Sequence, residues 1–516
     1  MTAASVLERA RFGAGLLARL VASKHGRRPP WQPRIDRGRA FIDRIGELDA
    51  MPGHPLSSLL RVAGWSSARV RAELSALGLE GTLKALAADG VRLDADEVKC
   101  RTPVVRRGDT VPFSPRDLEM IHGPAVPLGT SGTSGPRTKN PIDLAGFTLL
   151  ATYQHTMLDA LGARHLPLVL YYPAPSAAGI AHLISFALSG NPADAWFCHL
   201  PETESRLPWS GRLRLLSRIA GLAGVRLASP QLAPVEAPGP LVDWLGRHGR
   251  GGAVLATFPG SALRLQAHAE RTSRALPPLT FILGGEPITR RKRELLEARG
   301  HRVYPWYGAV DAGRIGIGCL APASADDMHL LSDRFAAIEW QGKLLLTSLS
   351  PSVHKRYLNT DCGDLARLER RDCGCPLGAL GLDFHLCDVR SVQKLCLEGI
   401  TLPADVVHHL ADELLPAHCG GSPADYQLLE EEGSDGWTRL VVRVAPEIRA
   451  ADREVIAQVH RVLRDACPGA PELARRIELA GVVAVRRERP RFSAGGKLLA
   501  AQRLPNRVEA ASGNAR

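Results

Sequence analysis

The sequence predicts an α/β protein with a large N-terminal domain of mostly parallel strand–helix layers and a small C-terminal α+β domain. The chain of 516 residues is too long for one ordinary hydrophobic core, so two or three domains are expected. Apolar residues make up 45% of the chain and charged residues 23%, as is typical of globular proteins. From about residue 167 onward short apolar runs alternate with helical patterns, and this alternation indicates a parallel sheet.

Helices dominate the predicted N-terminal part, because apolar residues recur at helical spacing in segments such as 68–88. Strands are then predicted over residues 168–172, 253–257, 279–283 and 302–306. The first strand precedes a helix-like run to Leu188, and the second precedes one that starts at Ser261. Thr289 is a favourable N-cap and Gly300 a helix-ending residue, so a charged helix is expected between them.

A smaller unit is expected to begin near residue 390. Its predicted strands are 392–397, 426–429, 440–444 and 477–485, and its predicted helices are 403–415 and 450–466. We therefore divide the chain into a helical N-terminal part of the large domain (1–125), the core of that domain (126–388) and a small C-terminal domain (390–516).

The net charge of +12 comes mostly from scattered arginines, and aromatic residues are not interleaved with the basic tracts. A nucleic-acid partner is therefore not expected, and a solvated arginine-rich surface is favoured over a surface that steers an anionic substrate. The sequence lacks the roughly 18 uninterrupted apolar residues of a membrane span, so a cytoplasmic protein is expected. Ten cysteines at irregular spacings favour reduced thiols, with a metal site as a further candidate.

One segment has the composition of a phosphate-binding loop. Glycines let backbone amides approach phosphate oxygens, hydroxyls add donors, and a cation balances the charge. The loop residues concerned are Thr130, Ser131, Gly132, Thr133, Ser134, Gly135, Arg137 and Lys139. The alternative is a flexible surface linker. A Walker loop is excluded, because no Gly-Lys-Ser/Thr ending follows.

This loop resembles the phosphate loop of the adenylate-forming (ANL) superfamily, although Pro136 and Arg137 stand in reversed order and Lys139 is displaced by one position. Arg137 or Lys139 could supply the charge. Further segments resemble motifs of that superfamily in the same order along the chain, over some 370 residues. They are Gly284-Gly285-Glu286-Pro287, Tyr307-Gly308-Ala309-Val310-Asp311, the segment from Arg356 to Leu365, Arg390 before Gly399, and the segment from Pro490 to Lys497.

The resemblance implies a role for each motif. The Gly284 to Pro287 turn would lie beside adenine, with Tyr307 stacked on that base and Gly308 next to it. Asp311, in place of the family's glutamate, would bind Mg²⁺. Asp364 would bind the ribose hydroxyls, Arg390 would lie at the hinge of a mobile C-terminal domain, and Lys497 would be the catalytic lysine.

Cys319, His329, Cys373 and Cys375 could together hold a structural Zn²⁺, because thiolates and imidazole are its usual ligands. This arrangement resembles members of the phenylacetate–CoA ligase-like branch. The alternative is a set of reduced cysteines in a hydrophobic core.

The implied activity is ATP-dependent activation of a carboxylic acid to an acyl-AMP, followed by transfer to a thiol, most simply coenzyme A. A carrier protein or an amine as acceptor, in a biosynthetic pathway, stays open, and so does a non-catalytic nucleotide-binding homologue. By family position Tyr172, Ile180 and Tyr304 would line the acid pocket and suit an aromatic or other compact apolar acid, unless they are ordinary core residues.

Overall fold

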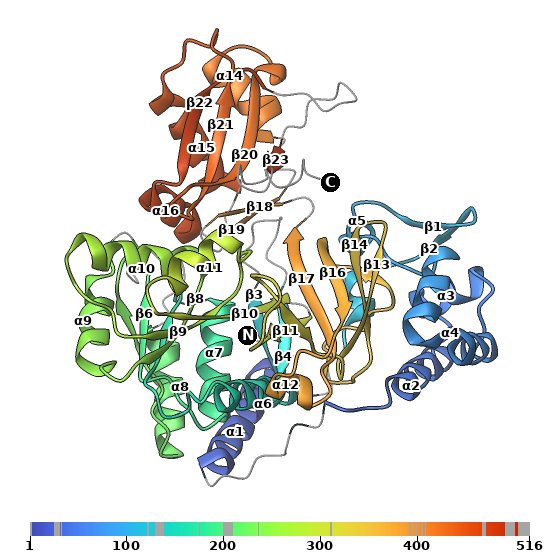
Figure 1. The fold of residues 1–516 in the computed structure, drawn as a ribbon. Coiled ribbons are helices and arrows are strands. Elements are labelled where there is room, and N and C mark those ends of the chain that lie inside the picture. The colour runs from blue at the N-terminus through green and yellow to red at the C-terminus, as the bar shows by residue number, and fades with distance from the viewer. Residues whose placement is uncertain are drawn as a thin grey trace.

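The computed structural model describes residues 3–24, 31, 33–120, 123–129, 139–174, 176–199, 210–235, 237–309, 312–391, 394–397, 400–403, 406–407, 409–466, 471–490 and 501–503. A mixed ten-stranded sheet forms the centre of the large part of the molecule (Figure 1). Its strand order is β16-β17-β12-β11-β10-β9-β8-β5-β6-β7. An α/β architecture with a large sheet is thus confirmed.

One half of this sheet is parallel. Its strands are β5 (Leu168–Tyr171), β6 (Ala195–Cys198), β7 (Pro230–Leu232), β8 (Ala253–Thr257), β9 (Leu279–Leu283) and β10 (Arg302–Ala309). All are buried along their length except the edge strand β7 and parts of β10. Parallel strands are covered by helices on both faces, which explains why β5, β8 and β9 contain no exposed residue. The helices of this half are α6 (Leu144–Ala160), α7 (Ala177–Leu188), α8 (Ser210–Leu222), α9 (Gly239–His248), α10 (Pro259–Arg271) and α11 (Arg290–Glu297).

The other half is antiparallel and continues from β10. It consists of β11 (Gly313–Gly318), β12 (Met328–Leu330), β17 (Phe384–Ser391) and β16 (Asp364–Arg370), with the short helix α12 (Pro376–Ala379) between the last two in sequence. The change from parallel to antiparallel pairing occurs at β10. Because ligands in α/β sheets bind beyond the carboxyl ends of parallel strands, the end of β10 is the first place to look for a site.

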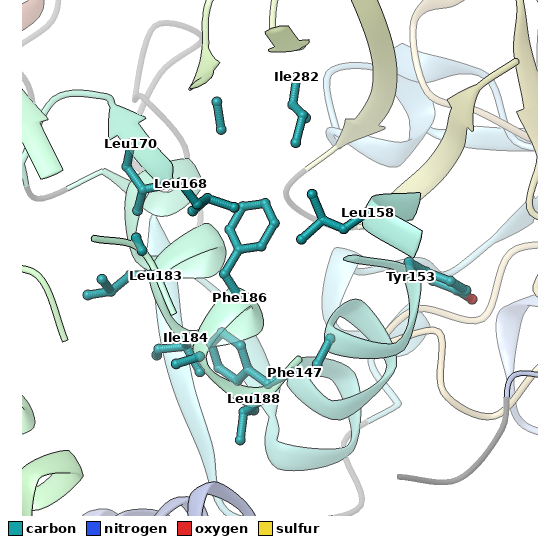
Figure 2. Close-up of a cluster of buried hydrophobic side chains, with 14 of the residues drawn as sticks. Phe147, Tyr153, Leu158, Leu168, Leu170, Leu183, Ile184, Phe186, Leu188 and Ile282 are labelled. Carbon is teal, nitrogen blue, oxygen red and sulfur yellow. The ribbon is translucent and has the colours of Figure 1, made fainter. Parts of the chain in front are cut away.

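The core of the parallel half lies between the sheet and helices α6 and α7. Figure 2 shows this cluster, in which Phe186 from α7 points toward Leu158 from α6, with Ile282 of β9 on the sheet side. The first helix, α1 (Ala3–Lys24), adds Phe12, which packs edge-to-face on Phe147. Long apolar side chains from distant parts of the sequence thus close one face of the sheet.

The N-terminal helices pack on the antiparallel half. They are α2 (Arg37–Asp49), α3 (Pro55–Val62), α4 (Ser67–Ala88) and α5 (Ala95–Val98), followed by the hairpin β1 (Val104–Arg106) and β2 (Asp109–Val111) and the 3₁₀ turn η1 (Pro115–Leu118). A second core cluster joins them to the three-stranded sheet of β13 (Phe335–Trp340), β14 (Lys343–Ser348) and β15 (Thr360–Asp361). The N-terminal helices thus share a core with this three-stranded sheet and with the antiparallel half.

The C-terminal unit, residues 400–503, has its own sheet and its own core cluster, to which Val235 of the large part also belongs. Its strand order is β22 (Val483–Arg487), β21 (Thr438–Val444), β20 (Tyr426–Glu432) and β23 (Ala501–Arg503). The hairpin of β18 (Lys394–Leu397) and β19 (Ile400–Pro403) leads into it. Its remaining elements are the π-helical turn η3 (His409–Leu414), α14 (Leu415–Cys419), the 3₁₀ turn η4 (Pro423–Asp425), α15 (Asp452–Ala466) and α16 (Pro471–Ala480).

The β20–β21 turn docks the C-terminal unit on helices α10 and α11, below it in Figure 1. Lys292 of α11 donates a hydrogen bond to Thr438 (2.8 Å) and lies 3.8 Å from the Glu432 carboxylate. Arg264 of α10 donates to the carbonyl of Ala480 (2.8 Å). Charged side chains of α10 and α11 therefore make polar contacts with the β20–β21 hairpin and with α16.

Most predicted elements are confirmed, and β8 and β9 have the predicted limits. The predicted strand over residues 477–485 is wrong in its first half. Ile477 and Ala480 instead lie on the buried face of α16, and the strand begins at Val483, after Gly481 in a left-handed conformation (φ 59°). Pro403, the first residue of the predicted 403–415 helix, is instead the last residue of β19.

No helix in the described ranges is long and apolar enough to cross a membrane.

Candidate active site

The predicted phosphate loop joins two paired strands. β3 (Ala125–Gly129) and β4 (Lys139–Asp143) are antiparallel, and Gly129 lies opposite Lys139. Residues 130–138, and with them the predicted ligands from Thr130 to Arg137, lie outside the described residues. Lys139 is thereby placed at the first position of β4.

The Gly284-Gly285 turn follows β9 at the carboxyl edge of the parallel strands. Gly285 has φ 83°, a conformation that favours glycine. A Cβ atom on Gly284 would come within 2.3 Å of the indole ring of Trp306. Glu286 accepts a hydrogen bond from the Gly260 amide at the start of α10 (3.0 Å), and Pro287 follows it. The lack of a side chain at Gly284 thus makes room for a tryptophan, a reason that the sequence did not reveal.

Tyr307 and Asp364 meet in the structure. The Tyr307 hydroxyl donates a hydrogen bond of 2.7 Å to the Asp364 carboxylate, although 57 residues separate the two in sequence. Tyr307 lies near the end of β10, and Gly308 follows it at a β-bulge where the register with β11 shifts. Bulges of this kind re-aim side chains next to active sites. The two residues predicted to bind adenine and ribose are therefore neighbours.

Arg390 lies in β17, one cross-strand position away from Asp364, because Leu365 pairs with Arg390. Its guanidinium donates to the Asp326 carboxylate (2.8 Å). The same carboxylate accepts the backbone amides of Asp388 (3.0 Å) and Val389 (2.9 Å). Asp326 thus fixes the backbone of β17 and the Arg390 side chain just before the C-terminal unit. The predicted Asp311 and Lys497 lie outside the described residues, so their positions stay predictions.

Two of the three predicted acid-pocket residues are near Arg314, with whose guanidinium both interact electrostatically. Tyr172 after β5 and Tyr304 of β10 are both fully buried, and burial raises the pKa of each hydroxyl. His182 of α7 stacks on Tyr172 at 5.3 Å and contacts the edge of Trp306. Burial lowers the pKa of His182 to about 3, so this imidazole is neutral. Ile180 is half-buried and packs against the same core cluster.

Cys319, His329, Cys373 and Cys375 converge on one point. Their four ligand atoms lie within 4.8 Å of one another. His329 Nε2 is 3.2 Å from the Cys375 sulfur and 3.8 Å from the Cys373 sulfur. These separations fit the edges of a tetrahedral zinc site, about 3.5 to 3.8 Å for normal bond lengths. His329 Nδ1 contacts the carbonyl of Leu382 (2.7 Å), so it holds the proton and leaves Nε2 for a metal.

The thiols in this cluster have perturbed acidities. A hydrogen bond from Cys319 strongly lowers the pKa of Cys375, and His329 adds to the effect. The same hydrogen bond raises the pKa of Cys319, which keeps its proton. Three sulfur donors and one imidazole nitrogen that converge on one point match the donor set of Zn²⁺, and the residues therefore fit this ion.

Sequence reasoning missed the residues around this cluster. His385 lies opposite His329 in the neighbouring strand, and its Nδ1 is 2.7 Å from the Asp327 carboxylate. Asp327 is also paired with Arg371. The sequence showed only how far apart the acidic and histidine residues lie along the chain. That spacing becomes informative once β12 and β17 are known to pair.

No protein-family model and no curated protein matches the sequence. Solved structures are similar. A 2-hydroxyisobutyryl-CoA ligase in complex with 2-HIB-AMP and CoA aligns with a TM-score of 0.55 and 17% identity, over 93% of this chain and 91% of that chain. A second structure of that ligase, with R3-HIB-AMP, has a TM-score of 0.40 and 14% identity over the same shares.

An o-succinylbenzoate CoA synthetase from Bacillus subtilis has a TM-score of 0.39 and 16% identity, over 74% of this chain and 69% of that chain. The 2-hydroxyisobutyryl-CoA ligase with 2-HIB-AMP and CoA shares its fold with this chain over nearly all of both chains. This protein therefore has the fold of a CoA ligase, with a large α/β part and a C-terminal domain.

Proposed function

We propose that this protein is an adenylate-forming ligase that activates a carboxylic acid with Mg-ATP and transfers the acyl group to coenzyme A. The hydrogen bond between Tyr307 and Asp364 carries the proposal. It joins an aromatic ring and a carboxylate at the end of β10, where the sheet changes from parallel to antiparallel. An aromatic face suits adenine, and a carboxylate accepts hydrogen bonds from two ribose hydroxyls.

The chemistry consists of two displacements. In the first, an oxygen of the acid carboxylate bonds to the α-phosphorus of ATP, and the bond to the bridging oxygen breaks, so that pyrophosphate leaves. In the second, the thiolate sulfur of coenzyme A attacks the acyl carbon, and AMP leaves with the electrons of the C–O bond. Lys497 would stabilise the charge that develops in the first step, and Asp311 would bind Mg²⁺. The segment from Thr130 to Lys139 would hold the phosphates.

The C-terminal unit would turn between the two steps. We place its boundary near residue 390, where Asp326 fixes Arg390 and the backbone of β17. The fold comparison supports this division, because the similar ligase was solved with both 2-HIB-AMP and CoA. A structural Zn²⁺ at Cys319, His329, Cys373 and Cys375 would tie α12 to β12. This proposed metal is consistent with a phenylacetate–CoA ligase-like enzyme.

A pyrophosphate-release screen over aromatic and aliphatic acids, with and without coenzyme A, tests the proposal. We expect acid-dependent release, and AMP and an acyl-CoA when coenzyme A is present. Lys497→Ala should lower acid-dependent ATP–pyrophosphate exchange by about 10² to 10³, the range seen when one preorganised charge stabiliser is removed. Asp243→Ala, an exposed residue on α9, is the matched control and should not change the rate.

Each other outcome has a defined meaning. Acid-dependent release without acyl-CoA formation would point to an amine or a carrier-protein phosphopantetheine as the acceptor. ATP binding without release for any acid would show a non-catalytic nucleotide-binding protein and contradict the proposal. Unchanged exchange in Lys497→Ala would exclude the role of that lysine.

A further inference from the structure

Arg314 is a buried cation at the predicted acid pocket. It lies in β11 opposite Gly308, at the β-bulge that follows Tyr307. Only 5% of the residue is exposed. Its guanidinium lies over the Trp306 ring at 4.3 Å and interacts electrostatically with the hydroxyls of Tyr172 and Tyr304. The arginine therefore belongs to the same space as the residues predicted to bind the acid.

Within the described part of the chain, no carboxylate forms an ion pair with Arg314, and its guanidinium makes no hydrogen bond. The nearby groups are neutral or positive. Burial keeps the Tyr172 and Tyr304 hydroxyls protonated, and Arg334 is a second cation. Asp333, which interacts with Tyr153 and Arg334, accepts hydrogen bonds from Trp31 (2.8 Å) and Tyr153 (3.4 Å).

The neighbouring polar groups in this space are donors. The Tyr304 hydroxyl is buried without a hydrogen-bond partner among the described residues. The Trp306 indole N–H, which faces Tyr172, also lacks a hydrogen bond of normal geometry. The guanidinium adds five further N–H donors in a planar fork that suits a carboxylate. These three groups can thus donate hydrogen bonds to a bound molecule, and none of them is an anionic acceptor.

The energy balance indicates a missing partner. A cation–π contact with tryptophan is favourable when it is desolvated, but it is weaker than the hydration that a guanidinium loses when it leaves water. Burial accordingly lowers the pKa of Arg314 to about 10, which still leaves it charged at neutral pH. Trp306 therefore offsets only part of the cost, and an anion in the pocket would offset the rest.

We propose that Arg314 is a specificity-determining residue that binds a second anionic group of the acid substrate, and that the substrate class is dicarboxylic acids with an apolar body between the two carboxylates. This inference rests on the proposed function. The aromatic rings of Tyr172, Tyr304 and Trp306 would contact the body of the acid. One carboxylate would react with ATP, and the distal carboxylate would pair with Arg314, with the Tyr304 hydroxyl as an additional donor.

Matched pairs of acids test the proposal: benzoate against terephthalate, phenylacetate against 4-carboxyphenylacetate, and hexanoate against adipate. Wild-type kcat/KM for pyrophosphate release should favour the diacid at least tenfold in one or more pairs. Arg314→Met should lower kcat/KM for that diacid about 100-fold, because truncating one partner of a buried charge pair costs several kcal/mol. The value for the matched monoacid should stay within threefold of wild type.

Arg334→Met is the control, because the Arg334 guanidinium is already bonded to backbone carbonyls, including that of Arg314 (2.8 Å). It should lower the Tm without changing the ratio of diacid to monoacid. Arg314→Met should keep or raise the Tm, and the diacid should raise the Tm of wild type only. Arg314→Lys, which keeps the charge, should retain part of the preference.

The inference is overturned if every monoacid matches or exceeds its diacid partner, if Arg314→Met lowers both acids equally, or if Arg314→Met fails to fold. Either of the last two results would show that Arg314 has a structural role or contacts the reacting carboxylate. Absence of pyrophosphate release for every acid with wild-type protein would instead overturn the proposed function, and this inference with it.

Discussion

At the scale of single residues, the contact between Tyr307 and Asp364 makes a graded prediction. Asp364→Ala removes the carboxylate and should raise the KM for ATP by about 10- to 100-fold, because hydrogen bonds to a charged group are worth about 1.5 to 3 kcal/mol. Tyr307→Phe removes only the hydroxyl that orients Asp364 and keeps the aromatic ring, so a change of about fivefold is expected. ATP-dependent pyrophosphate release at saturating acid measures both. Equal effects in the two variants would contradict these separate roles.

The cysteine–histidine cluster predicts a bound metal. Purified protein should contain about one equivalent of zinc, and Cys375→Ser should contain less than half an equivalent with a Tm several degrees lower, because a structural metal contributes to folding free energy. Metal analysis and thermal unfolding check this. Cys100→Ser, at an exposed thiol outside the cluster, serves as the control and should change neither quantity. Less than half an equivalent in wild-type protein would contradict the metal site.

At the scale of secondary-structure elements, the turn after β9 is fitted to a side chain of β10. Gly284→Ala would place a methyl group 2.3 Å from an atom of the Trp306 ring, which is a steric clash. It should lower the free energy of unfolding by about 1 to 3 kcal/mol, as overpacking does. Because Trp306 also lies against Arg314, a displaced Trp306 would disturb the predicted acid pocket. The kcat/KM for the acid substrate should therefore fall at least tenfold. Gly251→Ala is the control, since a Cβ there meets nothing within 4 Å. Denaturant unfolding and acid titrations measure the two effects, and an unchanged variant would show that Trp306 can move freely.

Sequence patterns predicted individual elements better than their pairing. The limits of β8 and β9 followed from short apolar runs, and Thr289 caps α11 as expected, accepting the Lys292 amide. The run from Ile477 was ambiguous, because four apolar residues around a glycine fit a helix end as well as a strand. Pairing depends on long-range packing, so the antiparallel half of the sheet could not be derived from periodicity.

The candidate site was predictable only where a motif carried it. Tyr307, Asp364 and the four cluster residues were named from resemblance, and the structure brings each group together. Arg314 had no such signal. An arginine in a strand normally faces solvent, and it is the bulge opposite Gly308 that coincides with its burial here.

At the scale of the whole molecule, buried histidines predict how stability depends on pH. Burial lowers the folded-state pKa of His182 to about 3 and that of His301 to about 4, from an ordinary value of 6.5. Between these values the unfolded chain binds more protons, so the free energy of unfolding falls as pH falls below 6.5. Each histidine can contribute up to about 1.4 kcal/mol per pH unit.

Denaturant unfolding at pH 6.5 and 4.5 measures this dependence. His182→Gln should lose about 2 kcal/mol less than wild type between the two pH values, because it has no imidazole to protonate. His248→Gln, at an exposed position, should follow wild type. The interpretation fails if His182→Gln and wild type lose the same stability.

The hairpin that docks the C-terminal unit combines burial with charge. Lys292 and Glu432 are each less than one-tenth exposed as side chains while the unit is docked. Separating apolar surfaces in water costs free energy, whereas these ions would regain on separation the hydration that docking took from them. The free-energy cost of separating the unit at this contact is therefore smaller than that of separating an apolar contact of the same size.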